Sequence, residues 1–150
     1  MGGAAFLTTG STRWRNCTIS RNRAAGHGGG LYFAVPGEFV NCVIVGNQSS
    51  VNSNYYFEGG TKAYFTNCCA MPSLNAYGTN NIAVDPSFID YDNFNFRLAR
   101  NSSCINAGTN MPWMAGAVEL DRCRRLDRFS GLVDMGCYEY VGAGTMISLK

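Results

Sequence analysis

The sequence predicts an all-β protein, a β-solenoid of about three coils followed by a C-terminal cap. One short pattern occurs three times, with its cysteines 25 and 26 residues apart, and a glycine-rich corner precedes each copy. The 18 glycines and the many asparagines tolerate left-handed backbone, which favours frequent turns. A period of roughly 20–30 residues built from short strands and turns is typical of solenoid proteins.

The three copies of the pattern are WRNCTISRN from Trp14, FVNCVIVGN from Phe39 and FTNCCAMPS from Phe65. Each has the form aromatic-x-Asn-Cys-x-apolar. The corners that precede them are GGAAF, GGGLYF and EGGTKAYF. The segments are too short for helices and are rich in β-branched and aromatic residues, which indicates strands.

An asparagine is expected to bend each copy of the pattern. Strict strand alternation would bury Arg15 beside Cys17 and expose Trp14, which is the worse arrangement. If Asn16 adopts the left-handed conformation, the chain bends, and Trp14 and Cys17 both face the core. Coils about 4.8 Å apart would then form three stacks. These are the aromatic residues Trp14, Phe39 and Phe65, the asparagines Asn16, Asn41 and Asn67, and the cysteines Cys17, Cys42 and Cys68. We expect the side-chain amides of the three asparagines to bond to one another along the axis.

The seven cysteines are an odd number, so at least one is free or pairs between chains. Stacked cysteines have parallel Cβ directions, so we expect the three in the repeats to be buried free thiols. The adjacent Cys68 and Cys69 should place one thiol inward and one outward. A metal site is not expected, because zinc needs converging ligands and the chain has one histidine. No cofactor is expected.

The repeat segments NCTISRN, GGGLYF and NCVIVGN resemble the repeats of polymorphic outer-membrane proteins and other right-handed parallel β-helix proteins. Residues 80–110 (NNIAVDPSFIDYDNFNFRLARNSSCINAGTN) and 117–140 (AVELDRCRRLDRFSGLVDMGCYEY) resemble the closing segment of bacterial secreted β-helix proteins with a choice-of-anchor Q domain. The resemblance implies a right-handed parallel β-helix from a secreted or cell-surface protein. The residues that match the closing pattern are Asp121, Arg125, Gly131, Asp134, Gly136 and Glu139, whereas Arg122, Cys123 and Arg124 replace its Gly-Asn-Pro.

We therefore divide the chain into β-helix coils over 1–75, a closing coil or cap over 76–140 and a tail over 141–150. A cap must cover the open core at the end of a solenoid. The apolar residues expected to plug that end are Phe88, Phe94, Phe96, Leu98, Ile105, Val133 and Met135. We expect ion pairs between the acids Asp121, Asp134 and Glu139 and the arginines Arg97, Arg100, Arg125 and Arg128. A disulfide of Cys104 with Cys123 or Cys137 is favoured, although sequence does not determine connectivity.

Composition limits the partners. The net charge of +2 is too small to indicate nucleic acid binding. The sequence contains no apolar run of 18 residues, so we expect no membrane span. No signal peptide is visible, yet the wealth of Asn, Gly, Ser, Thr and Tyr suggests an extracellular fragment. No cap precedes the first coil, so we expect it to stack on upstream coils or on another chain.

The stretch GHGGGLYF, residues 26–33, contains the His-Gly-Gly-Gly of some lipase oxyanion holes and the Gly-His-Gly of polygalacturonases. The lipase interpretation needs a G-x-S-x-G elbow, which is absent. The polygalacturonase interpretation needs paired carboxylates, and residues 1–75 contain only Glu38 and Glu58. We therefore expect His27 to be an exposed corner residue.

Three groups of residues are candidates for ligand binding. Tyr55 and Tyr56, in the polar loop SSVNSNYYFEGG, could form a sugar-stacking platform or pack on the flank of the solenoid. Arg21 and Arg23 form a cationic pair. A weak calcium candidate combines Asp85, Asp90 and Asp92.

We predict a non-catalytic C-terminal fragment of a bacterial secreted or cell-surface β-helix protein, with a structural or adhesive role. One alternative is a polysaccharide lyase or glycoside hydrolase with its catalytic residues upstream, and another is a carbohydrate-binding module. The expected partner is a polysaccharide or a cell-surface glycan. Carboxylates clustered on one flank would favour the enzyme, and an aromatic platform without acids would favour binding.

Overall fold

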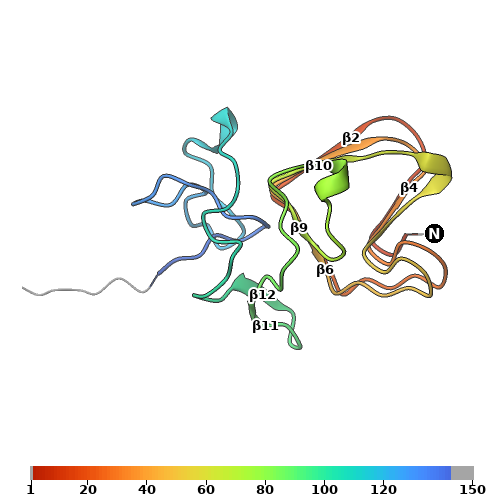
Figure 1. Ribbon diagram of the computed structural model, residues 1–150. Helices are drawn as coiled ribbons and strands as arrows, with labels where there is room; N and C mark the ends of the chain where they lie inside the picture. The colour runs from red at the N-terminus through yellow and green to blue at the C-terminus, as the bar shows by residue number, and fades with distance from the viewer. Residues whose placement is uncertain (1, 143–150) are drawn as a thin grey trace, which may run out of the picture.

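The computed structural model describes residues 2–142, which form short β-strands and three 3-10 helices but no α-helix (Figure 1). The protein is all-β, and its main sheets are parallel. Most of the predicted tail, residues 143–150, lies outside the described residues. Among residues 2–142, no helix has the length and apolar character needed to cross a membrane.

Each of three successive repeats contributes three strands. Repeat 1 contains β1 (Ala5–Leu7), β2 (Thr12–Arg15) and β3 (Thr18–Ser20). Repeat 2 contains β4 (Leu31–Phe33), β5 (Gly37–Val40) and β6 (Val43–Val45). Repeat 3 contains β7 (Tyr55–Phe57), the 3-10 helix η1 (Glu58–Gly60), β8 (Tyr64–Thr66) and β9 (Cys69–Ala70).

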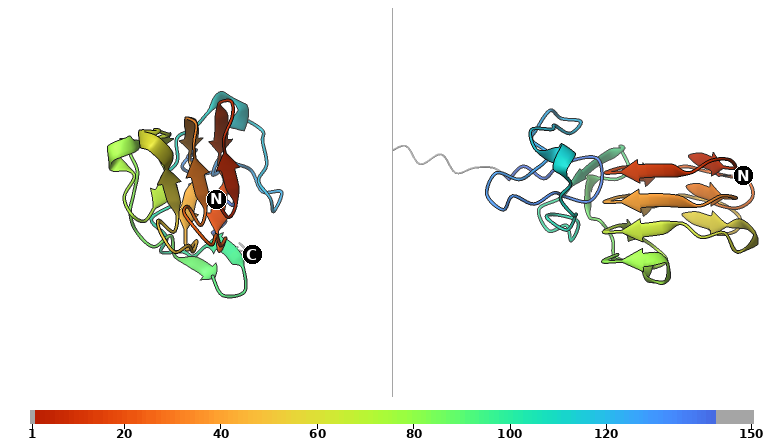
Figure 2. Two further views of the ribbon diagram at one scale, coloured as in Figure 1. Left: turned by 90° about the vertical axis from the view of Figure 1, so that its right-hand side faces the viewer. Right: turned by 90° about the horizontal axis from the view of Figure 1, so that it is seen from above.

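Corresponding strands of the repeats pair in parallel and form three sheets (Figure 2). The first sheet has the order β1-β4-β7 and the third has the order β3-β6-β9. The second sheet has the order β2-β5-β8 and adds β10 (Gly78–Thr79) beside β8. Trp14 pairs with Phe39, and Phe39 pairs with Phe65, so equivalent positions of the repeated pattern lie over one another.

The asparagine of each pattern bends the chain between the second and third sheets. The φ angles of Asn16, Asn41 and Asn67 are 48°, 55° and 50°, in the left-handed region that asparagine tolerates. The bend lets Phe39 and Cys42 both be fully buried although they are three residues apart. The rings of Phe39 and Phe65 stack with centroids 5.0 Å apart, and those of Trp14 and Phe39 with centroids 5.7 Å apart.

The predicted amide ladder along these three asparagines is wrong. Asn41 donates to the carbonyl of Thr109 at 2.9 Å and accepts from its N–H at 2.8 Å. The amides of Asn16 and Asn67 donate to the carbonyls of Asp134 and Ala107. The amides point away from the core at the bend, where the C-terminal part of the chain supplies backbone partners.

A ladder of asparagine amides does form at a different corner, between the third and first sheets. The Oδ1 atom of Asn47 accepts from the backbone and side-chain nitrogens of Asn22, and Asn47 donates to Oδ1 of Asn54 at 2.9 Å. Asn47 and Asn54 are buried, so these bonds satisfy polar groups that water does not reach.

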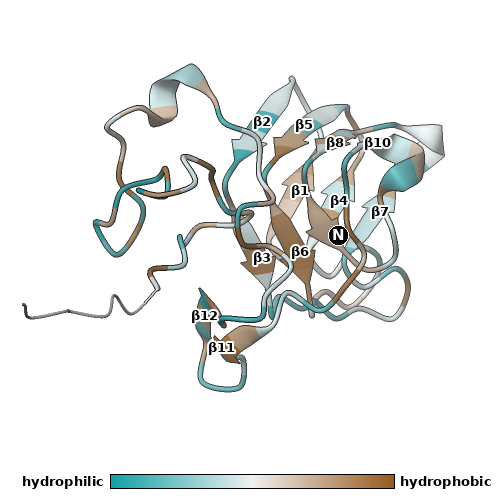
Figure 3. Ribbon diagram, turned by 60° about the vertical axis from the view of Figure 1, so that its left-hand side comes forward, coloured by the Kyte–Doolittle hydropathy of each residue, from teal (hydrophilic) through white to brown (hydrophobic). Residues whose placement is uncertain are grey.

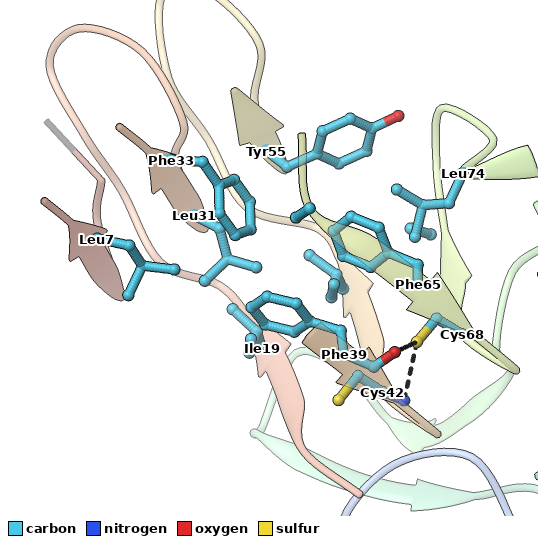
Figure 4. Close-up of a cluster of buried hydrophobic side chains, with 13 residues drawn as sticks. Leu7, Ile19, Leu31, Phe33, Phe39, Cys42, Tyr55, Phe65, Cys68 and Leu74 are labelled. Atoms are coloured by element: carbon cyan, nitrogen blue, oxygen red, sulfur yellow. Dashed lines mark hydrogen bonds between the residues drawn. The ribbon is translucent and has the colours of Figure 1, made fainter. Parts of the chain in front are cut away.

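The interior between the three sheets is apolar and aromatic (Figure 4). Leu31, Phe33, Phe39 and Phe65 are fully buried there. At the end beyond repeat 3, the buried Leu74 and the 3-10 helix η2 (Asn75–Tyr77) lie against this core. The end of the core is therefore covered by the segment that directly follows repeat 3.

The C-terminal segment, residues 85–142, lies along the flank of the repeats rather than over their end (Figures 1 and 2). It begins with the antiparallel hairpin β11 (Phe88–Asp90) and β12 (Asn95–Leu98) and contains the 3-10 helix η3 (Pro112–Met114). Its bonds to Asn16, Asn41 and Asn67 reach all three repeats. The apolar strands β3 and β6 lie on the side that it covers (Figure 3).

A second core joins the C-terminal segment to the outer face of the third sheet. Its buried residues are Val43, Val45, Cys69, Leu98, Cys104 and Met135. Of the residues expected to plug the end of the solenoid, Leu98, Val133 and Met135 are buried in this lateral arrangement, whereas Phe94 is 64% exposed. These residues pack at the side of the repeats because the outer face of the third sheet is itself apolar.

Two of the expected ion pairs are present in the C-terminal segment. Arg97 pairs with Asp121 on the surface, and Arg125 pairs with Glu139 at 2.9 Å in a buried position. Asp134 instead accepts the backbone N–H groups of Asn106 and Tyr140. Burial raises the pKa of Asp134, and these two bonds oppose that shift.

All seven cysteines are free thiols. Cys42 and Cys68 are fully buried in the core of the repeats, and Cys17 packs against that core. Cys68 belongs to the inner core and Cys69 to the lateral core, so the two adjacent thiols face opposite sides of the strand. The expected bond of Cys104 to Cys123 or Cys137 is absent.

Candidate ligand-binding face

Strand β7 separates the two tyrosines that were expected to form a platform. Tyr55 is 8% exposed and packs in the core, where its hydroxyl lies 3.2 Å from the carbonyl of Ser73. Tyr56 follows it and is half-buried on the outer face. Because successive side chains of a strand point to opposite faces, Tyr56 lies on the outer face and Tyr55 faces the core, although both line one open hollow.

Three aromatic side chains form a row across the outer face of the first sheet. Phe6, Tyr32 and Tyr56 are the middle residues of β1, β4 and β7 and share one register. The ring centroids of Phe6 and Tyr32 are 4.8 Å apart, and those of Tyr32 and Tyr56 are 5.1 Å apart. Phe6 is 43% exposed. The row thus runs along the stacking direction of the repeats and is open to solvent.

His27 extends this row. Its ring stacks on Tyr56 with the centroids 4.3 Å apart and the planes at 29°. The expectation of an exposed corner is incorrect, because His27 is half-buried and its Nδ1 atom has no hydrogen-bond partner within residues 2–142. We call Phe6, Tyr32, Tyr56 and His27 the aromatic row.

Polar groups flank the aromatic row. The pKa of Tyr32 is raised to about 12 because its hydroxyl lies against the Glu58 carboxylate, which disfavours the tyrosinate. Beside Tyr56 there is an open hollow of about 380 Å³. Its lining includes Asn52, Thr61 and Lys62. A ligand on the row would therefore meet one carboxylate, one ammonium and neutral hydrogen-bonding groups.

Arg21 and Arg23 both line an open hollow of about 320 Å³, but their other contacts differ. Arg21 holds the β11–β12 hairpin, because its Nη1 atom donates to the carbonyls of Tyr91 and Asp92, both at 2.9 Å. Its guanidinium also lies 4.4 Å from the ring centroid of Phe94. Arg23 is exposed and also lines a second open hollow, of about 780 Å³, with Gln48 and three serines. The structure therefore gives Arg21 an internal partner and leaves Arg23 on a polar surface.

The three aspartates of the calcium candidate do not converge. Asp85 accepts the N–H of Ser87, and Asp90 accepts from Asn93, so both carboxylates stabilise their own turns. The side chain of Asp92 is 93% exposed near Arg21. Within the part of the chain that the structure describes, no three His, Cys, Asp or Glu residues are placed to hold a metal ion.

Sequence reasoning missed Phe6 and Tyr32. The signal was present, because each is the middle residue of a three-residue strand whose neighbours are apolar (AFL and LYF). Alternation places such a residue outward when its neighbours face the core. What the sequence did not reveal is the register that places the three aromatic residues side by side.

The chain matches no protein-family model, no curated protein and no solved structure.

Proposed function

We propose that this chain is a non-catalytic segment of a right-handed parallel β-helix from a bacterial secreted or cell-surface protein, and that it binds a glycan through the aromatic row. Three parallel sheets with one strand from each repeat support the β-helix. Crossovers between parallel strands of one sheet are almost always right-handed. The resemblance of the repeats to those of polymorphic outer-membrane proteins, and of the closing motifs to choice-of-anchor Q segments, supports the bacterial surface setting.

The aromatic row is the observation that carries the adhesive role. Aromatic rings that face water offer apolar surface to the C–H faces of pyranose rings, while a tyrosine hydroxyl adds a hydrogen bond. The two centroid distances of 4.8 and 5.1 Å give the row a length similar to that of a disaccharide. A linear glycan lying along the stacking direction would contact each ring in turn.

The charges beside the row favour a neutral glycan. Glu58 lies against Tyr32 at the middle of the row, where its carboxylate would accept hydrogen bonds from sugar hydroxyls and repel a uronate. Lys62 in the adjoining hollow supplies donors. The proposed partner is therefore a neutral hexose polysaccharide.

The enzymatic alternative needs two carboxylates flanking a scissile bond. Glu58 is the carboxylate that the structure places beside the row, and Glu38 is engaged by Arg13 at 2.9 Å. An aromatic row with a single acid favours binding over hydrolysis.

Each of β1, β2 and β3 is an edge strand in the described sheets. These strands are therefore available for pairing with a further coil or another chain.

Affinity measurements on soluble neutral and uronate-containing oligosaccharides test this function. We expect the neutral chain to bind more tightly, and Tyr32→Ala and Tyr56→Ala each to weaken its binding about tenfold, or about 1.4 kcal/mol. Tyr64→Ala is the matched control, because Tyr64 is 69% exposed on the second sheet. Equal losses in all three variants, or no binding by the unmodified chain, would contradict the proposal.

A further inference from the structure

Two fully buried thiols lie in the core between the repeats and the C-terminal segment. Cys69 lies in β9 on the outward side of the third sheet, and Cys104 lies in the segment that covers that sheet. Both are 0% exposed and belong to the same core as Leu98 and Met135. Positions far apart in the chain thus place two thiols in one apolar core.

The Cys69 thiol donates to the carbonyl of Val84 at 3.3 Å and shares its buried core with Cys104. The Cys104 thiol is the main cause that lowers the pKa of Cys69, and the Cys69 thiol is the main cause that raises the pKa of Cys104. The backbone of Cys104 is held in place, because its carbonyl accepts the N–H of Met135 at 3.0 Å and its N–H bonds to Ser102. The fold therefore holds both thiols in one buried core.

We propose that Cys69 and Cys104 are a disulfide site, and that their oxidation ties the C-terminal segment covalently to the third sheet. The other cysteines are placed differently. Cys137 donates its N–H to Thr18 in repeat 1, and Cys123 lines a hollow beside Arg124. Cys17, Cys42 and Cys68 stack in one direction along the repeats, an arrangement whose parallel Cβ directions do not favour bridging.

The chemistry requires a disulfide oxidant such as oxidised glutathione. When the segment opens, the Cys69 thiolate attacks one sulfur of the oxidant, forms a mixed disulfide and releases one glutathione thiolate. The Cys104 thiolate then attacks the Cys69 sulfur, which forms the protein disulfide and releases the second glutathione thiolate. Two protein thiols lose two electrons, the oxidant gains them, and the two thiol protons end on the two glutathione molecules.

Peptide mapping identifies the bond. The unmodified chain is equilibrated with reduced and oxidised glutathione, alkylated and digested with trypsin without reduction. Trypsin leaves Cys104 in peptide 101–122 and Cys69 in peptide 63–97. We expect these two peptides to be linked. The second peptide also contains Cys68, so the link should vanish in Cys69→Ser and persist in Cys68→Ser.

Thermal unfolding of the oxidised and reduced chain provides a second readout. The bond closes the loop from residue 69 to residue 104, so we expect oxidation to raise the Tm by roughly 5–10 °C. This difference should disappear in Cys104→Ser and remain in Cys123→Ser, which is the matched control.

A fully alkylated Cys104 after oxidation, or a link from peptide 101–122 to the peptides that hold Cys123 or Cys137, would overturn the inference. So would a link confined to Cys17 and Cys42. Cys17 is the most accessible competitor, because it is half-buried and its pKa is lowered to about 7 by the hydrogen bond from Cys42. Glycan affinity measured on the same samples is independent, because the aromatic row lies on the first sheet.

Discussion

At the scale of single residues, asparagine does two separate jobs in this protein. Asn16, Asn41 and Asn67 use the left-handed conformation to turn the chain, and their amides bind the C-terminal segment. Asn22 and Asn47 use their amides to join neighbouring repeats. Both jobs depend on a short side chain that carries a donor and an acceptor.

Replacement of Asn41 by glycine separates the backbone role from the side-chain role. Glycine tolerates the φ of 55°, so the loss comes from the two bonds to Thr109. We expect a decrease of about 2 kcal/mol in the free energy of unfolding, measured with urea. Asn80→Gly is the control, because Asn80 has a φ of 56° but is exposed, and its loss should stay below about 0.5 kcal/mol. Equal losses would mean that the amide bonds contribute nothing.

At the scale of elements, three-residue strands decide which side chains become core and which become surface. In β7, the side chain of Tyr55 lies in the core, while that of Tyr56 belongs to the aromatic row. In β9, the side chain of Cys69 lies on the outer face of the third sheet. The hairpin β11–β12 packs Phe96 against its own Phe88 and Phe94, and two further contacts join its turn to the repeats. Arg21 holds its turn, and the hydroxyl of Tyr91 donates to the carbonyl of Gly46 at 3.0 Å.

We expect Arg21→Ala to loosen this hairpin without unfolding the repeats. The variant loses two hydrogen bonds and the cation–π contacts with Tyr91 and Phe94. Amide hydrogen exchange over residues 88–98 should accelerate at least tenfold, while exchange in β5 should not change. Arg23→Ala, which removes an exposed arginine, should leave both rates as they are. Unchanged protection of the hairpin in Arg21→Ala would show that the arginine does not hold it.

At the scale of the whole molecule, the C-terminal segment and the three repeats share one lateral core. Val43 and Val45 point outward from β6 and are nevertheless almost fully buried, because residues 85–142 cover them. Burial of apolar surface of this kind contributes about 25 cal/mol per Å². The repeats therefore depend on the segment for the apolar face of their third sheet.

A chain that ends at residue 84 should expose this face and associate with itself. Light scattering after size-exclusion chromatography should show oligomers, whereas the chain that retains the segment should be less associated under the same conditions. Adding Val45→Lys to the shortened chain places a charge on the exposed face and should reduce the association. A shortened chain that stays monomeric would contradict a covering role for residues 85–142.

The repeated pattern alone specified the strands, the bend at Asn16, Asn41 and Asn67, and the aromatic stack of Trp14, Phe39 and Phe65, because these follow from local geometry and from burial of the larger side chains. Only the tertiary structure decided that the segment after residue 84 lies along the flank, that Cys104 and Cys69 share one buried core, and that Phe6 and Tyr32 join Tyr56 in one row. These arrangements depend on which surfaces meet, and a linear pattern of apolar residues does not distinguish an end from a flank. The separation of Tyr55 from Tyr56 has the same origin, because alternation tells that two neighbours diverge but only the packed core tells which of them is inside.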